Sequence, residues 1–206
     1  MTQAKEAFKA MRIFFTGVGG QGTLLATRLV GEAALEEGLS VAMSEIHGMA
    51  QRGGVVESSV VVGDVFSPTI PDGEADILMA FEPLEAVRAL PKCNPKTMVI
   101  SSTIPLVPFT VATGQSTYPD VEELRKMTEE KVGRLLWVDA MALAKQAGSD
   151  RASNIVMVGI LAGTGCLPIS KQSWQGALKK ILPGRILEVN RKAFELGFKA
   201  GEESGK

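Results

Sequence analysis

Two glycine-containing loops hold the residues that are best suited to ligand chemistry. The first loop, residues 17–22 (Gly-Val-Gly-Gly-Gln-Gly), directly follows the apolar run at residues 13–15. It matches the G-x-G-x-x-G spacing, in which glycines permit a tight turn and leave backbone N–H groups open to a phosphate. The helix N-terminus after such a loop also attracts anions. The spacing therefore predicts a nucleotide-like or phosphate-bearing ligand, whereas the plainer interpretation is that the glycines only permit close packing.

The second loop, residues 44–54 (Ser-Glu-Ile-His-Gly-Met-Ala-Gln-Arg-Gly-Gly), follows the apolar residues 41–43. Its His47 is the single histidine of the chain, so it cannot join a histidine pair, but it can serve as one acid–base group or position the loop. Arg52 stands beside two glycines, and its planar guanidinium suits a phosphate or carboxylate that approaches the backbone closely. The alternative for Arg52 is a salt bridge, either within the subunit or across an interface.

Three acidic residues follow expected strands. Glu45 lies at the end of the second strand, where a dinucleotide-binding fold places the acid that binds ribose. Glu82 and Asp139 each precede an expected helix, and Asn154 opens another. We therefore expect Glu82, Asp139 and Asn154 to cap helix N-termini. We therefore predict no catalytic residue in this chain. A hydride-transfer enzyme would also need a substrate region with a proton donor, which we do not find in the sequence.

Cys93 and Cys166 are the two cysteines of the chain, and they form no C-x-x-C pair. They therefore predict neither an iron–sulfur cluster nor a structural zinc site, and we expect no metal site. Two reduced, buried thiols are typical of a cytoplasmic protein. The first ten residues lack the apolar stretch of a signal peptide. We therefore expect a cytoplasmic location.

Short apolar strands alternate with amphipathic helices along the chain. Apolar and β-branched runs predict strands at residues 12–16, 40–44, 55–62, 76–81, 97–101 and 135–138. The spacing of apolar residues predicts helices at residues 22–37, 83–90, 121–131, 140–147, 154–165, 172–182 and 186–201. The helix at 154–165 is apolar nearly all round and carries Gly159 and Gly163, which indicates burial with close backbone contact. Pro183 and Gly184 are expected to separate the last two helices.

This alternation predicts an α/β fold with a doubly wound, mostly parallel sheet and helices on both faces, which is a Rossmann-like arrangement. We expect a single domain over residues 12–203 that ends in a helical segment, with residues 1–11 as an N-terminal extension. In such a sheet, ligands bind at the carboxyl ends of the strands, and both glycine loops lie at strand ends.

The composition excludes some partners and favours others. A net charge of −1 gives no basis for binding nucleic acid or an acidic membrane surface. No segment of the sequence has the uninterrupted apolar length of a membrane span. Hydrophobic residues make up 45% of the 206 residues, and the mean hydropathy is positive. We attribute this surplus to a buried sheet and a sizeable subunit interface, which would also permit a homodimer of the isolated chain.

Together, these motifs resemble the gamma-type subunit or domain of 2-oxoacid:ferredoxin oxidoreductases. The resemblance rests on the glycine loop with its helix, on the loop that ends Arg-Gly-Gly, and on residues 76–83, 139–140, 154–159 and 190–194. It spans nearly the whole chain after Met11. The His-Gly-Met approach to Arg-Gly-Gly is most similar to the beta subunit of indolepyruvate ferredoxin oxidoreductases, since the pyruvate and 2-oxoglutarate branches usually lack it.

The resemblance implies a supporting subunit in the CoA-dependent oxidative decarboxylation of an aryl 2-oxoacid, with ferredoxin as acceptor. It places thiamine diphosphate and the iron–sulfur clusters on a large partner subunit, in agreement with the missing Gly-Asp-Gly motif and cysteine cluster here. The resemblance further implies that ferredoxin is a partner of the assembled complex and that this chain binds no cofactor tightly. Coenzyme A is then a ligand shared between the subunits, and the isolated chain is inactive. The implied cofactor-binding residues are Gly17, Gly19, Gly20, Gln21, Gly22, His47, Gln51, Arg52, Gly53 and Gly54.

Two alternatives stay open at this point. The glycine fingerprint and Glu45 also fit a freestanding NAD(P)- or flavin-dependent oxidoreductase. A coenzyme A or adenine-nucleotide binding module without redox partners is the second alternative. The apolar composition argues against the latter, because it indicates an obligate partner.

Overall fold

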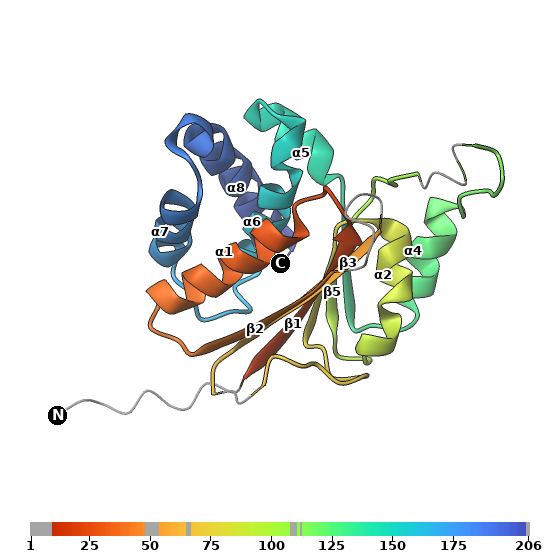
Figure 1. The fold of residues 1–206 in the computed structure, drawn as a ribbon, viewed down its shortest axis with the longest axis horizontal. Coiled ribbons are helices and arrows are strands. Elements are labelled where there is room, and N and C mark those ends of the chain that lie inside the picture. Colours follow the sequence, from red (N-terminus) through yellow and green to blue (C-terminus); the bar gives the residue numbers. More distant parts are fainter. Residues whose placement is uncertain (1–9, 48–53, 65–66, 108–110, 112, 205–206) are drawn as a thin grey trace.

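The computed structural model describes residues 10–47, 54–64, 67–107, 111 and 113–204 (Figure 1). Its centre is one six-stranded sheet with the order β2-β3-β1-β4-β5-β6. The neighbours β1, β4, β5 and β6 run parallel, whereas β3 runs antiparallel to both β1 and β2. The sheet is therefore mixed but mostly parallel, which confirms the predicted α/β fold class.

The strands and helices lie where the sequence pattern predicts them, with shifts of a few residues at their ends. The strands are β1 (Met11–Val18), β2 (Val41–His47), β3 (Val55–Val62), β4 (Ile77–Ala80), β5 (Met98–Ser102) and β6 (Arg134–Val138). The α-helices are α1 (Thr23–Glu36), α2 (Pro83–Arg88), α4 (Val121–Glu129), α5 (Ala140–Ala147), α6 (Ser153–Gly163), α7 (Lys171–Ile181) and α8 (Gly184–Ser204). Short 3₁₀ turns lie at Leu90–Lys92 and Asp150–Ala152.

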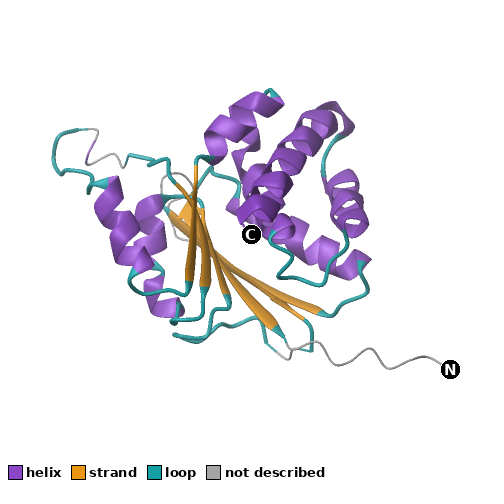
Figure 2. Cartoon of the chain, turned by 180° about the vertical axis from the view of Figure 1, so that it is seen from behind, coloured by secondary structure: helices purple, strands orange, loops and turns teal. Residues whose placement is uncertain are grey.

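Helices cover both faces of the sheet (Figure 2). Side chains alternate between the faces, as strand geometry requires: Ile13 and Phe15 join the larger core, under α1 and α5–α8, whereas Phe14 joins the smaller core, on the side of α2. The parallel strands β1, β4 and β5 are thus buried on both sides, which explains their continuous apolar sequences.

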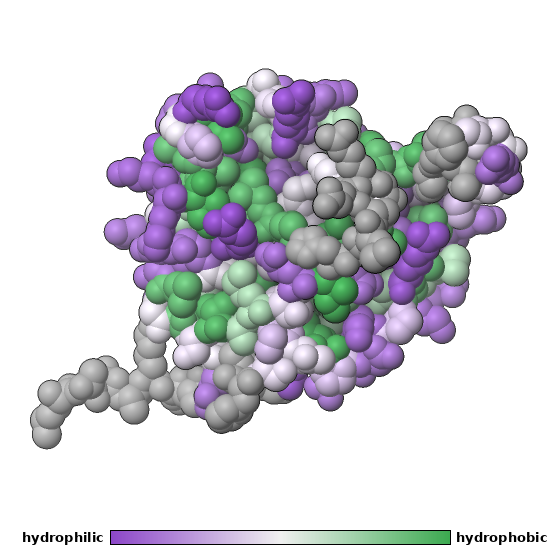
Figure 3. Space-filling model, viewed as in Figure 1, coloured by the Kyte–Doolittle hydropathy of each residue, from purple (hydrophilic) through white to green (hydrophobic). Residues whose placement is uncertain are grey.

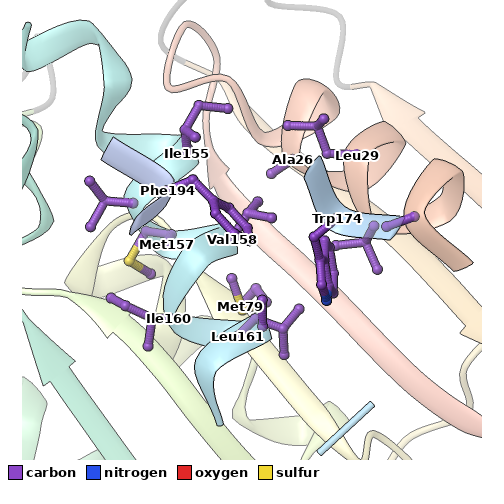
Figure 4. Close-up of a cluster of buried hydrophobic side chains, with 14 of the residues drawn as sticks. Ala26, Leu29, Met79, Ile155, Met157, Val158, Ile160, Leu161, Trp174 and Phe194 are labelled. Carbon is purple, nitrogen blue, oxygen red and sulfur yellow. The ribbon is translucent and has the colours of Figure 1, made fainter. Parts of the chain in front are cut away.

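The larger core is centred on α6, whose side chains are buried along nearly its whole length. Figure 4 shows Ile155, Met157 and Val158 of this helix among the labelled core residues, close to Phe194 of α8. A helix that is apolar on all sides has to be surrounded, and α1, α5, α8 and the sheet provide this environment. The predicted burial of this helix is confirmed.

Helices α6 and α8 approach each other through glycines on both sides. A Cβ atom at Gly159 would lie 2.3 Å from the carbonyl oxygen of Phe194, and one at Gly163 would lie 2.0 Å from that of Phe198. In return, Gly197 and Gly201 of α8 would meet carbonyl oxygens of α6 at 2.1 and 2.3 Å. Such close contact is possible only without side chains, so the predicted role of the α6 glycines is confirmed and extends to α8.

Hydrophobic side chains are also exposed near the open edge of the sheet. In Figure 3, green hydrophobic surface lies where Figure 1 places the outer strand β2 and the adjoining end of α1. Leu35, Met43 and Ile46 are among the exposed large hydrophobic residues. This distribution agrees with the expectation that part of the apolar surplus serves an interface.

None of the helices within the described residues is both long enough and apolar enough to cross a membrane.

Candidate functional site

The carboxyl ends of the four parallel strands meet at one end of the sheet, at the top of the view in Figure 1. The loops that follow these strands border a cleft of about 460 Å³. This is the position at which open α/β sheets bind ligands. The cleft is lined by Gly20, Gln21, Phe81, Ser102, Ile104, Pro105, Leu106, Ala140, Met141, Asp150, Arg151, Ser153 and Met157.

Gln21 fixes the shape of the first glycine loop. Its side-chain Oε1 accepts a hydrogen bond from the backbone N–H of Val18 at 2.8 Å, and its Nε2 donates to the carbonyl of Phe81 at 2.9 Å. The side chain therefore closes the turn and ties it to the end of β4. Gly20, at a φ of +106°, stays exposed and reaches the cleft. Of the predicted loop residues, Gly20 and Gln21 thus line the cleft.

Two helix N-termini without side-chain caps converge beside this loop. Gly22 is the N-cap of α1 and Ala152 that of α6, and neither position has a side-chain cap hydrogen bond. The hydroxyl of buried Thr23, the first residue of α1, has no hydrogen-bond partner within the described structure. Open N–H groups and the positive ends of two helix dipoles favour an anionic ligand near this point.

Asn154 joins these two helices instead of capping one. Its Nδ2 donates to the carbonyl of Gly22 at 3.2 Å, and its Oδ1 accepts from the N–H of Ile155 at 3.0 Å. The predicted capping role of Asn154 is therefore wrong, because α6 begins one residue earlier, at Ser153, and the side chain turns toward the glycine loop.

Arg151 adds a positive charge to the cleft that the sequence analysis did not identify. It lies in the 3₁₀ turn before α6, is exposed, and lines the cleft together with Asp150. An exposed guanidinium next to an uncapped helix N-terminus suits a phosphate or carboxylate. A basic residue just before the apolar helix was the available signal, although the sequence did not show that this turn would face the glycine loop.

The two glycine loops are neighbours in space. The N–H of Gly19 donates to the carbonyl of Gly54 at 2.9 Å, and the strand register places Val18 opposite Val55. Gly17 and His47 both face Val56 on β3, from its two sides. The predicted site residues Gln51, Arg52 and Gly53 lie outside the described residues, as does the side chain of His47.

Glu45 does not occupy the position of a ribose-binding acid beside the glycine loop. Glu45 pairs with Ser58, which in turn pairs with Phe15, so β3 separates Glu45 from β1. In the dinucleotide-binding arrangement the second strand is the direct neighbour of the first. The sequence alone did not reveal that the third strand would insert between them.

Glu82 caps α2 and also holds one wall of the cleft. Its Oε2 accepts from the N–H of Glu85 at 3.0 Å, which confirms its capping role. Its Oε1 accepts from the N–H of Leu106 at 3.2 Å and from the hydroxyl of Tyr118. Burial, together with the hydrogen bond to the Glu82 carboxylate, raises the pKa of Tyr118 well above its ordinary value. The carboxylate thus connects α2 to the segment that contributes Leu106 to the cleft.

Asp139 caps α5 as predicted, because its Oδ1 accepts from the N–H of Ala142 at 2.8 Å. This cap satisfies the N-terminus of α5, in contrast to the N-termini of α1 and α6. The anion-binding potential of this end of the sheet is therefore concentrated at the glycine loop and α6.

The two thiols are half-buried and lie on opposite faces of the sheet. Cys166 packs against the larger core and Cys93 against the smaller one. Burial raises the pKa of the Cys93 thiol to about 11 and shifts the pKa of Cys166 in the same direction. Within the described ranges, no group of three or more His, Cys, Asp or Glu residues could hold a metal ion.

The sequence profile of the pyruvate ferredoxin/flavodoxin oxidoreductase family matches residues 12–200. The chain belongs to this family. It is 42% identical, over 93% of its length and 98% of the relative's, to a protein named indolepyruvate oxidoreductase subunit IorB from Methanothermobacter thermautotrophicus. The match therefore extends over essentially the whole of that small subunit.

Solved structures of ferredoxin oxidoreductases share the fold. The gamma subunit of a keto/oxoacid ferredoxin oxidoreductase from Geobacter sulfurreducens superposes with a TM-score of 0.67 at 23% identity, covering 94% of this chain and 99% of that one. A 2-oxoglutarate:ferredoxin oxidoreductase from Magnetococcus marinus, solved with coenzyme A bound, gives a TM-score of 0.71 at 21% identity. The superposition covers 95% of this chain and 31% of that larger chain. The fold thus occurs both as a separate subunit and as part of a longer chain.

Proposed function

We propose that this chain is the beta, or gamma-type, subunit of an indolepyruvate or arylpyruvate:ferredoxin oxidoreductase. The observation that carries this proposal is the 42% identity to an indolepyruvate oxidoreductase subunit over 98% of that subunit's length. A match of this extent covers the core, the glycine loop and the helical C-terminal part together. It is not confined to a common nucleotide-binding fingerprint, so it does not favour a freestanding NAD(P)-dependent enzyme.

The reaction of the assembled enzyme would be an oxidative decarboxylation. The bond between C1 and C2 of the 2-oxoacid breaks, C1 leaves as carbon dioxide, and C2 forms a thioester with the sulfur of coenzyme A. Two electrons pass to ferredoxin, and one proton is released. We assign the iron–sulfur clusters to the large subunit, because the two cysteines of this chain lie on opposite sheet faces and cannot ligate one cluster together. We assign the thiamine diphosphate to it as well, because the sequence of this chain has no Gly-Asp-Gly motif.

The role that we assign to this chain is to bind the phosphate-bearing part of coenzyme A. The cleft offers the exposed backbone at Gly20, the uncapped N-termini of α1 and α6, and the guanidinium of Arg151. These groups suit phosphate oxygens, whereas the apolar wall with Ile104, Leu106 and Met157 suits an uncharged portion of the ligand. Because Gly19 is hydrogen-bonded to Gly54, the second loop would complete the site, with Arg52 as a further phosphate contact.

The proposal is tested by separating and recombining the two subunits. Each purified subunit alone is expected to be inactive in reducing ferredoxin or a viologen dye with indolepyruvate and coenzyme A. Their mixture is expected to restore turnover that depends on both substrates. Full activity of the large subunit alone would contradict the proposal, as would saturable binding of NAD(H) by the isolated small subunit.

A further inference from the structure

One part of the sheet has no helix above it among the described residues. On the face of the smaller core, α2 and α4 pack on β1, β4, β5 and β6. The antiparallel pair β2 and β3 extends beyond them, and its outward side chains on this face include Ile46, which is paired with Glu57. Ile46 is 62% exposed and Val55 is 39% exposed. Large apolar side chains on an open edge of a sheet are typical of a protein interface.

A buried carboxylate lies at the bottom of this uncovered face. Glu85 of α2 has only 4% of its side chain exposed, and its Oε1 is 2.6 Å from Nη1 of Arg88. Its Oε2 has no hydrogen-bond partner among the described residues. A hollow of about 380 Å³ is lined by Ile46, Val55, Glu57, Glu85 and Arg88. Leaving a carboxylate oxygen buried and unpaired is costly, so the hollow is suited to receive a hydrogen-bond donor.

The charges around this hollow favour a cationic donor. Glu57 and Glu85 contribute two carboxylates, while Arg88 contributes one guanidinium, which already contacts Glu85. A lysine or arginine side chain that enters between the apolar side chains of Ile46 and Val55 would lie beside the Glu57 and Glu85 side chains that line the hollow. Apolar contact around a desolvated charge pair is the composition found at the energetic centre of protein interfaces.

The position of this surface indicates which protein covers it. Val55 is paired with Val18, which belongs to the first glycine loop, so the surface lies at the same end of the sheet as the cleft. A protein that docks here is brought next to the ligand of the cleft. In a second copy of this chain, the cation of this surface, Arg88, is already paired with Glu85, so the surface is not complementary to itself.

We propose that Ile46, Val55 and Glu85 form the docking surface for the large subunit, which inserts a basic side chain toward Glu85. This inference rests on the proposed function, because it takes the partner from it. The docked large subunit would be held against the end of the sheet at which coenzyme A binds.

Binding of the separately purified large subunit from the same organism to this chain tests the inference. Ile46→Ser is expected to weaken binding by about tenfold or more, without loss of folding, because the side chain is exposed. Glu85→Gln, which preserves shape but removes the charge, is expected to weaken binding by about tenfold and to reduce its dependence on salt. Met127→Ser is the matched control, because Met127 is 48% exposed on α4, which covers the other end of this face.

Three outcomes would overturn the inference, and they differ in what they imply. If Ile46→Ser and Glu85→Gln both bind the large subunit with wild-type affinity, the docking surface is contradicted but the proposed function is not. Loss of self-association of this chain in Ile46→Ser, with unchanged binding of the large subunit, would identify a second copy as the partner of this face. Failure of the wild-type chain to bind the large subunit at all would contradict the proposed function as well.

Discussion

The side-chain amide of Asn154 donates a hydrogen bond to the carbonyl oxygen of Gly22, 3.2 Å away, although 132 residues separate the two in the chain. Gly22 has a φ of +79°, and a Cβ atom there would lie 2.3 Å from Nδ2 of Asn154. The contact therefore joins the N-terminus of α6 to the glycine loop that begins α1. It makes the two open helix ends parts of one site.

We expect Asn154→Ala to weaken both the fold and the cleft. Loss of this partly buried hydrogen bond should lower the free energy of unfolding by about 1–2 kcal/mol, because the Gly22 carbonyl loses its side-chain donor. The KM for coenzyme A of the assembled enzyme should rise severalfold, since the glycine loop is no longer held against α6. Chemical denaturation and steady-state kinetics measure the two effects.

Asn190→Ala is the matched control for this prediction. Asn190 is also buried and donates its own side-chain hydrogen bond, to the carbonyl of Ile186 at 2.7 Å, but it lies in α8, away from the cleft. It should lower stability by a similar amount and leave the KM for coenzyme A unchanged. Equal effects of both variants on KM would show that Asn154 acts only through stability.

The Tyr118 hydroxyl is expected to stabilise the cleft wall through Glu82. Tyr118→Phe removes one of the donors to a carboxylate that is 1% exposed. A buried carboxylate that loses a donor is destabilised by about 1–3 kcal/mol. The same carboxylate oxygen accepts from the N–H of Leu106, so the position of the Leu106 segment is also less well fixed. We expect a higher KM for coenzyme A with an unchanged KM for the 2-oxoacid. A variant that binds coenzyme A as the wild type does would contradict this role of Glu82.

The glycines between α6 and α8 are expected to be intolerant of even one methyl group. Gly163→Ala and Gly197→Ala would each place a Cβ within 2.1 Å of a backbone carbonyl oxygen, so the helices must move apart. We expect a loss of about 3 kcal/mol or more in the free energy of unfolding. Gly176→Ala in α7, where the nearest atom would be 3.7 Å away, should instead raise stability by up to about 1 kcal/mol. Similar changes in the free energy of unfolding for Gly163→Ala and Gly176→Ala would contradict the close packing of α6 against α8.

Cys93 should react slowly with thiol reagents in the native protein. Burial raises its pKa from 9.0 to about 11, so the fraction of reactive thiolate at pH 8 is about 100-fold lower than that of a free thiol. Because the pKa is higher in the folded state, stability from this group is present below pH 9 and falls as the pH rises toward 11. Reaction with Ellman's reagent, compared for native and denatured protein and for Cys93→Ser, measures the difference. Equal rates of reaction of Cys93 in the native and the denatured protein would contradict the expected protection of this thiol.

The local pattern of the sequence was sufficient to predict the strands and helices of the fold. β3 lies at the predicted residues 55–62, and α6 has the predicted burial, because strand alternation and an all-round apolar helix are local signals. The start of α8 at Gly184 differs from the predicted residue 186, since Pro183 precedes the helix and its carbonyl accepts from Ile186. In a sequence, a proline just before a helix is interpreted as part of a longer segment between two helices.

The site required information that local patterns do not contain. The first glycine loop and the caps Glu82 and Asp139 were predictable because strand ends, glycine spacing and capping residues are local features. The contact of Asn154 with Gly22 depends on how two distant helices pack, and so does the position of Arg151 in the cleft. The separation of Glu45 from β1 depends on sheet order, which the sequence of strands does not determine.

The most direct test of the account is the dependence of the assembled enzyme on coenzyme A in the variant Gly19→Val. Gly19 belongs to the first loop and donates its N–H to Gly54 of the second, so a branched side chain there should obstruct the approach of phosphate to the backbone. We predict a KM for coenzyme A that is at least about tenfold higher, with unchanged kcat and unchanged KM for indolepyruvate, as expected when only ligand binding is lost. Gly184→Val, at a position with no atom near the added Cβ, should show none of these changes. An intact Gly19→Val complex with the wild-type KM for coenzyme A would contradict the assignment of the cleft.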